Sequence, residues 1–182
     1  ASDGRIYVID NASTANGNVV PSRTIEGPAT QLGNPVDLIL DGNNVRVAEK
    51  AKDQLLIFSN IFTGAGGNIT PDISIAEIKP ESLVSQKTLG PLNPDVTDVE
   101  NPATLINSIV VTSNPATPTP TTEFVARLSP NLQTTQTTFN TSRGVPTVES
   151  LTFDLTGDGF ITFDNGSDTN GGILVVNRLA ES

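Results

Sequence analysis

The chain of 182 residues contains no cysteine, histidine, methionine or tryptophan. Without cysteine it forms no disulfide, and without cysteine or histidine it lacks the usual ligands of zinc and haem and the base of a Ser-His-Asp or Cys-His nucleophile. Carboxylates, hydroxyls, lysines, arginines and one tyrosine remain for catalysis. We therefore assign no catalytic and no cofactor-binding residue. The sequence leaves the question of enzymatic activity undecided and favours a non-enzymatic role.

Basic residues are also scarce, because 10 lysines and arginines stand against 20 acidic residues and the net charge is −10. The phosphates of a nucleic acid would be repelled over most of such a surface. No stretch approaches the roughly 18 continuous apolar residues of a membrane-spanning helix. We expect neither nucleic-acid binding nor a membrane span.

The composition favours a location outside the cytosol. Residues 1–4 include no methionine and no basic-then-apolar targeting pattern, so the chain reads as a mature or excised product. The absence of cysteine and the many threonines, asparagines, glycines and prolines favour an extracellular, cell-surface or periplasmic protein over a cytosolic enzyme.

Helical periodicity is almost absent, and the apolar residues come in short β-branched runs between Gly, Asn, Asp and Pro. This pattern predicts an all-β protein whose strands are joined as meanders. The clearest expected strands are residues 5–10, 36–40, 45–48, 55–59, 109–112, 123–128, 151–154, 160–163 and 173–176.

One pattern recurs after about 50 residues. Residues 6–11, 17–21 and 23–25 match residues 55–60, 67–71 and 73–75. A different part of the unit recurs later, since residues 35–47 and 55–60 resemble residues 146–162 and 173–178. Residues 34–39 and 101–106 form a weaker match. A unit of about 40 to 50 residues with several short strands is typical of a β-propeller blade, a four-stranded antiparallel meander.

The best-matched stretch also carries specific motifs: a GN(V/I)xP loop, an R-T-I strand, a Gly-x-x-T-x-L turn and a P-x-x-(I/L)-x-x-D strand, within residues 15–48. In these motifs the chain resembles the bacterial NHL/YVTN-type β-propeller repeats. The resemblance is specific over residues 5–76, moderate over 145–180, and fades over 77–142. It implies a secreted or cell-surface propeller that serves as a binding or structural scaffold module, with a protein or glycan partner, and it implies no particular ligand.

We interpret residues 1–182 as a single propeller domain of about three to four blades, whereas six or seven blades would need roughly 270 to 320 residues. The chain would then be a fragment of a longer propeller, a half-propeller completed by a second copy, or an open array. Exposed strand edges promote association. We therefore expect part of a larger or oligomeric propeller, and keep the subunit of an extracellular fibre or lattice as one alternative function.

Two segments fall outside the repeat. Residues 77–101 contain three prolines and few β-branched runs, so we expect an irregular insertion or connection there. Residues 114–122 are rich in Thr and Pro and predict an extended surface loop.

One loop resembles the first half of a calcium-binding loop. Asp154, Thr156 and Asp158 occupy positions 1, 3 and 5 of the EF-hand spacing, with Gly159 at position 6. Position 12 is Asn165, where an EF-hand has a bidentate glutamate. We name Asp154, Thr156 and Asp158 as candidate Ca²⁺ ligands. The alternative is a plain hairpin turn in which Asp158-Gly159 supplies the positive φ.

A second alternative function is a metal-dependent, lactonase-like hydrolase, which the propeller resemblance would allow. It needs converging carboxylates at a central channel, and the candidates are Asp10, Asp37, Asp41, Glu49 and Glu149. No convergence is visible from the sequence. Asn-x-Ser/Thr acceptor patterns for glycosylation begin at Asn11, Asn68, Asn140 and Asn165.

Overall fold

The structure, a computed structural model, is all β. It describes residues 4–76, 79–89, 105–113, 125–128, 135–139, 147–154, 157–164 and 171–177. These residues form strands and two short 3-10 turns, and none of them lies in an α-helix. No helix in these ranges is long and apolar enough to cross a membrane. The chain divides into two compact units, Ala1–Pro80 and Glu81–Ser182, where the sequence suggests one domain.

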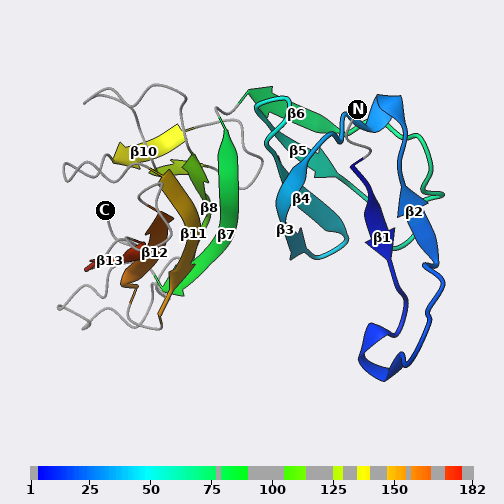
Figure 1. The fold of residues 1–182 in the computed structure, drawn as a ribbon, viewed down its shortest axis with the longest axis horizontal. Helices are drawn as coiled ribbons and strands as arrows, with labels where there is room; N and C mark the ends of the chain where they lie inside the picture. The colour runs from blue at the N-terminus through cyan, green and yellow to red at the C-terminus, as the bar shows by residue number, and fades with distance from the viewer. Residues whose placement is uncertain are drawn as a thin grey trace, which may run out of the picture. The chain divides into compact units, whose positions relative to one another are not determined.

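The first unit contains an antiparallel pair and an antiparallel meander (Figure 1). Strand β1 (Ile6–Val8) pairs with β2 (Arg23–Ile25), and the 3-10 turn η1 (Ala12–Thr14) lies in the connection between them. A second turn, η2 (Pro28–Thr30), leads on from β2. The meander then runs in chain order through β3 (Pro35–Asp41), β4 (Asn44–Glu49), β5 (Gln54–Phe58) and β6 (Ile73–Ala76).

The core of this unit lies between the β1–β2 pair and one face of the meander. Alternate residues of a strand point to opposite faces, so Ile6 and Val8 turn inward together while Tyr7 turns outward. The inward residues join Leu56 and Phe58 of β5 in one buried cluster, to which the central strand β4 also contributes. The β1–β2 pair is thus packed as a second layer on the sheet.

The pairing of β1 with β2 recurs in the pairing of β5 with β6, with the same register. In the first pair Ile6 stands opposite Ile25, and in the second Leu55 stands opposite Ile75. Asn11 follows β1 and Asn60 follows β5 at the equivalent position, and both have a φ of 55°. The recurrence seen in the sequence is therefore a recurrence of backbone conformation and pairing.

The second unit contains two sheets. One has the order β10-β9-β8-β7, and its strands are β7 (Pro80–Leu89), β8 (Leu105–Ser113), β9 (Val125–Leu128) and β10 (Thr135–Phe139). The other is an antiparallel meander of β11 (Thr147–Phe153), β12 (Gly159–Asp164) and β13 (Gly172–Val176). Val148, Leu151 and Ile161 form its buried core, against which Val84 of β7 packs.

The β11–β13 meander repeats the geometry of β3–β5. Both leading strands carry an irregularity near their start, between Pro35 and Asp37 in β3 and between Val148 and Ser150 in β11. Beyond it the registers correspond, so that Leu174 takes the place of Leu56. The weaker sequence echo at residues 146–178 is thus confirmed over the described residues.

The irregular connection predicted over residues 77–101 is wrong for residues 80–89, which form the ten-residue strand β7. The sequence missed it because this stretch is mostly polar. Pairing with β8 and burial of Ser82 and Leu83 favour the strand in spite of its weak pattern. Residues 77, 78 and 90–101, and the predicted loop 114–122, lie outside the described residues.

Candidate functional site

The candidate calcium loop connects β11 to β12. The Oδ1 atom of Asp154 accepts a hydrogen bond of 3.0 Å from the amide of Asp158, and the amide of Asp154 donates one of 3.1 Å to the carbonyl of Asp158. The two carboxylate residues are therefore brought together at the base of the turn. Thr156, the third predicted ligand, lies outside the described residues.

The turn itself differs from the prediction in one detail. Gly157 has a φ of 89°, whereas Gly159 begins strand β12 with no positive φ. The residue with a positive φ is thus Gly157, directly before the predicted Asp158-Gly159 pair. The connection between the two strands is five residues long, from Asp154 to Asp158, and the amide of Gly157 donates a hydrogen bond of 3.3 Å to the carbonyl of Asp154.

The acidic residues considered for a central channel are engaged in structural bonds. Asp10 accepts from Arg23 at 2.8 Å, across the β1–β2 pair. Asp41 accepts from the buried guanidinium of Arg46 at 2.9 Å. Each ion pair ties a strand end to its neighbour.

Glu49 is the most deeply buried of these carboxylates, with no exposed surface. Its Oε1 accepts backbone N–H bonds from Gly33 at 3.0 Å and from Asn34, and its Oε2 accepts from Lys52 at 2.7 Å. Hydrogen bonding to backbone amides is how a buried carboxylate is stabilised without a cation. Glu49 therefore joins the segment before β3 to the turn after β4, a role that the sequence did not reveal.

The remaining two acidic candidates do not join the others. Asp37 directs its Oδ1 to the amide of the next residue, Leu38, at 2.8 Å. Glu149 is exposed on β11, in the second unit. Among the described residues, no group of three or more Asp or Glu side chains is placed to hold a metal ion.

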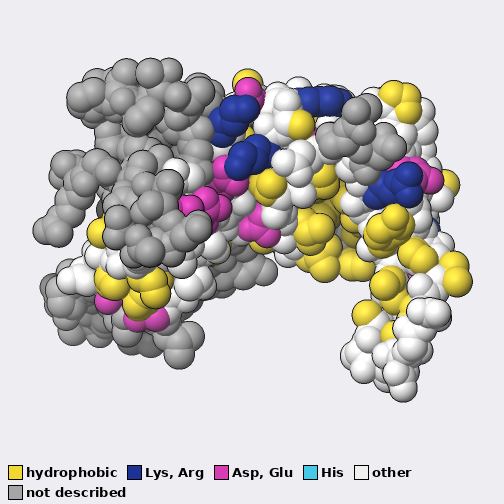
Figure 2. Space-filling view, viewed as in Figure 1, with side chains coloured by type: hydrophobic (Ala, Val, Ile, Leu, Met, Phe, Trp, Pro, Cys, Tyr) yellow, Lys and Arg dark blue, Asp and Glu magenta, His cyan; other side chains and the backbone are white. Residues whose placement is uncertain are grey.

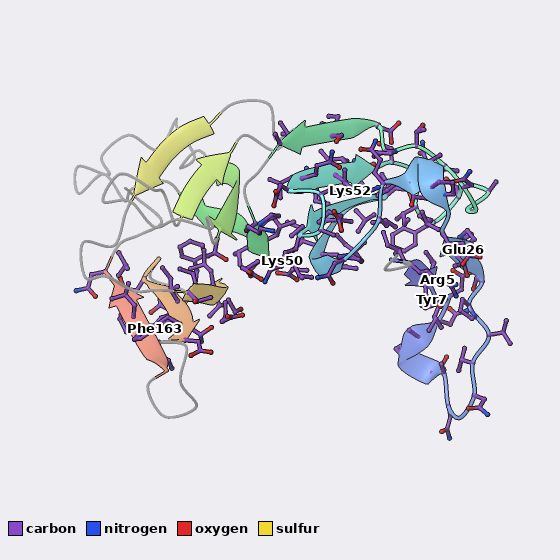
Figure 3. The ribbon with its side chains drawn as sticks, turned by 45° about the horizontal axis from the view of Figure 1, so that its top comes forward. Arg5, Tyr7, Glu26, Lys50, Lys52 and Phe163 are labelled. Atoms are coloured by element: carbon purple, nitrogen blue, oxygen red, sulfur yellow. The ribbon has the colours of Figure 1, made fainter. Side chains whose placement is uncertain are left out.

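The connection between β1 and β2 is the most exposed loop of the first unit, because every residue from Asn11 to Val20 is exposed. Val20, with 86% of its surface accessible, stands near its end. Figure 3 shows the hairpin that presents this loop, where Arg5 and Glu26 form a 2.9 Å ion pair beside Tyr7. The equivalent connection between β5 and β6 is bonded instead to the β3–β4 turn, where Asn43 accepts from the amides of Ile61 and Phe62 at 2.8 and 2.9 Å.

Several apolar side chains are exposed at the surface, which the sequence analysis did not predict. We define three sets: the β1 outer face, which is Tyr7 of β1 and Ile9 directly after the strand; the β3 row, Val36, Leu38 and Leu40; and the β13 outer face, Ile173 and Val175. Figure 2 shows hydrophobic side chains at the surface over β1. Strand alternation shows which residues share a face of the sheet, but it does not show which face is exposed. The packing in the structure shows that these faces are exposed.

No protein-family model matches this chain. No match was found among the curated proteins either. Its function is therefore inferred from its own residues and their arrangement.

Proposed function

We propose that the protein is a secreted or cell-surface β-propeller module, of the NHL/YVTN type, with a binding or structural scaffold role. The observation that supports this best is the repeat of one strand pair, with the same register, in β1–β2 and β5–β6. On this proposal β3–β6 is one complete blade, β1–β2 is the outer half of the preceding blade, and β11–β13 are three strands of another.

The packing in the first unit agrees with this proposal. Blades of a propeller stack face to face, so each sheet must be apolar on both faces. The central strands β4 and β5 have this character, since residues pointing to either face of the sheet are buried. The apolar face of β1–β2 packs on one of these faces.

The chemistry of the carboxylates favours a scaffold over a hydrolase. Asp10 and Asp41 are held by arginines, and the Glu49 carboxylate is surrounded by backbone amides. Groups held in this way stabilise loops and strand ends. They are poorly suited to activating water or to exchanging metal ligands during a reaction.

Recognition in this proposal falls to the exposed β1–β2 connection, residues 11–20. Loops at the ends of rigid strands commonly carry binding residues. Val19 and Val20 are exposed there without packing partners in the core cluster, which favours a contact with a glycan or protein surface. We also propose, as a separate feature, that a Ca²⁺ ion in the β11–β12 loop uses Asp154, Thr156 and Asp158.

Binding of the labelled chain to an array of bacterial and animal glycans tests the proposed role. We expect saturable binding to a subset of glycans, and a loss of about tenfold or more when Val19 and Val20 are both changed to Ser. Val36→Ser is the matched control, since it removes an exposed valine from β3 and leaves the loop intact. Absence of binding together with calcium-dependent hydrolysis of simple lactones would instead support the hydrolase.

A further inference from the structure

The β1 outer face and the β13 outer face are both exposed, although each lies on a strand whose opposite face is packed. Tyr7 and Ile9 expose 54% and 39% of their surface, and Ile173 and Val175 expose 65% and 49%. On the opposite faces, Ile6 and Val8 of β1 belong to a buried cluster, and Leu174 and Val176 of β13 are partly buried and pack against another. These two faces are therefore open sides of otherwise packed sheets.

The chain already contains the kind of interface that would cover them. In the first unit, Ile6 and Val8 of β1 pack in one cluster with Leu56 and Phe58 of β5. Here the inner face of one strand pair meets the sheet of the following repeat. Each partner contributes two apolar residues, two positions apart on a strand.

The repeat relates the exposed residues to the packed ones. Alignment of β1 with β5 by their pairing places Tyr7 at the position of Leu56, and Ile9 follows it at the position of Phe58. Tyr7 and Ile9 are thus equivalent to the side of the interface that receives a neighbour. Both side chains are exposed.

Alignment of β13 with β5 places Ile173 at the position of Leu55 and Val175 at that of Ile57. Leu55 and Ile57 in turn correspond to Ile6 and Val8 of β1. Ile173 and Val175 are thus equivalent to the other side of the interface, the side that docks on a neighbour.

We propose that two copies of this chain associate head to tail, with Ile173 and Val175 of one copy packed on Tyr7 and Ile9 of the next. The contact continues the stacking that β1 and β5 show within the chain. It uses two different surfaces, so it is heterologous, and repetition gives a closed ring or an extending filament. The occupant of each open face is a second copy.

Charge sets the conditions for this association. Each copy has a net charge of −10, so two copies repel one another at low ionic strength. Apolar packing between like-charged copies should strengthen as salt screens that repulsion. A contact carried by opposite charges would weaken instead.

Site-directed cross-linking tests the pairing of the two faces, on a chain with no native cysteine. Tyr7→Cys and Val175→Cys are purified separately, mixed and oxidised. We expect a covalent dimer in the mixture and little from either variant alone. A dimer from Tyr7→Cys alone would show a symmetric contact and overturn the proposal, as would an internal disulfide in a monomer carrying both cysteines.

Light scattering coupled to size exclusion measures the assembly itself. We expect the wild type to exceed its 19.0 kDa monomer mass, increasingly with salt, and Val175→Asp to weaken assembly by about tenfold or more, because it places a charge in an apolar contact. Val36→Asp is the control, since it places the same charge on an exposed valine of β3, outside both faces, and should leave assembly unchanged. A wild-type monomer at all salt concentrations would overturn the proposal.

The two proposals fail separately. If the Val19 and Val20 variant loses glycan binding but still assembles, the result supports the role of the loop. If Val175→Asp loses assembly but still binds glycans, the result supports the role of the stacking faces. Circular dichroism of each variant, compared with the wild type, verifies that the strands are retained. Assembly that survives Val175→Asp in a folded protein would contradict the role of β13.

Discussion

The backbone amide of Ser22 donates a hydrogen bond of 2.8 Å to the carbonyl oxygen of Val8. About 50 residues later the amide of Asp72 donates a bond of the same length to the carbonyl of Ile57. Both donors follow a proline, and both bonds close the connection between two antiparallel strands. The repeat is thus maintained by backbone hydrogen bonds where the side chains differ.

The side chains of these two donors make equivalent bonds, and this gives a first prediction. Ser22 Oγ accepts from the amide of Asp10 at 3.0 Å, and Asp72 Oδ2 accepts from the amide of Ser59 at 2.7 Å. Ser22→Ala and Asp72→Ala should each lower the free energy of unfolding by about 1 kcal/mol in urea denaturation. Ser22→Asp should cost less than Ser22→Ala, because aspartate performs this role in the other repeat. An equal cost would show that the two sites are not equivalent.

Much of the first unit could be predicted from the sequence, because its strands are apolar, β-branched and separated by turn residues. The expected strands at 36–40, 45–48 and 55–59 coincide with β3, β4 and β5 to within one or two residues. Strand β7 could not be predicted in this way. Its polar residues carry no period, and its conformation depends on pairing with β8, a distant part of the chain.

The candidate site was predictable only in part. The spacing of Asp154 and Asp158 placed both residues in one loop, where the amide of Asp158 donates a hydrogen bond to Oδ1 of Asp154. Their binding of Ca²⁺ stays a prediction. The environment of Glu49 was not predictable, because its partners lie up to 16 residues away and donate through their backbones, which leaves no side-chain pattern. The exposure of Ile173 was hidden for a similar reason, since an apolar strand residue looks the same whether or not a neighbour covers it.

Glu49 gives a second prediction. Glu49→Ala leaves the buried backbone N–H of Gly33 and the partly buried N–H of Lys52 without an acceptor, and should lower the free energy of unfolding by about 3–5 kcal/mol. Glu49→Gln keeps one carbonyl oxygen and should cost less. Glu26→Ala is the control, because its exposed ion pair with Arg5 should contribute less than about 1 kcal/mol. If Glu49→Ala and Glu26→Ala unfold at the same urea concentration, Glu49 is not an anchor.

Two glycines of the first unit give a third prediction. Gly27 has a φ of 113°, and a Cβ there would lie 2.5 Å from Oδ1 of Asn68, the atom that accepts a hydrogen bond from Ala29. Gly27→Ala should therefore destabilise the unit by about 2–3 kcal/mol. Gly17 has a φ of 72° with open space around it, so Gly17→Asn should cost about 0.5 kcal/mol or less. Thermal unfolding of the two variants measures the difference, and equal melting temperatures would contradict it.

The β11–β12 loop gives the last prediction, which separates a calcium site from a plain turn. Asp154→Asn keeps an Oδ1 that can accept the amide of Asp158, so the turn should persist while the charge is lost. If the loop binds Ca²⁺, saturating calcium should raise the stability of the wild type by about 2.7 kcal/mol at a hundredfold excess over the dissociation constant. The double variant Asp154→Asn/Asp158→Asn should lose this increment. Glu149→Gln, which removes an exposed charge from β11, should retain it.

The opposite result would have an equally definite meaning for this loop. A wild type whose melting temperature is unchanged by calcium would assign Asp154 to the turn alone, where its Oδ1 holds the amide of Asp158. In that case Asp154→Ala should destabilise the protein by about 1 kcal/mol whether or not calcium is present, because the lost hydrogen bond does not involve the ion. The dependence of that loss on calcium therefore distinguishes a ligand from a turn-forming residue.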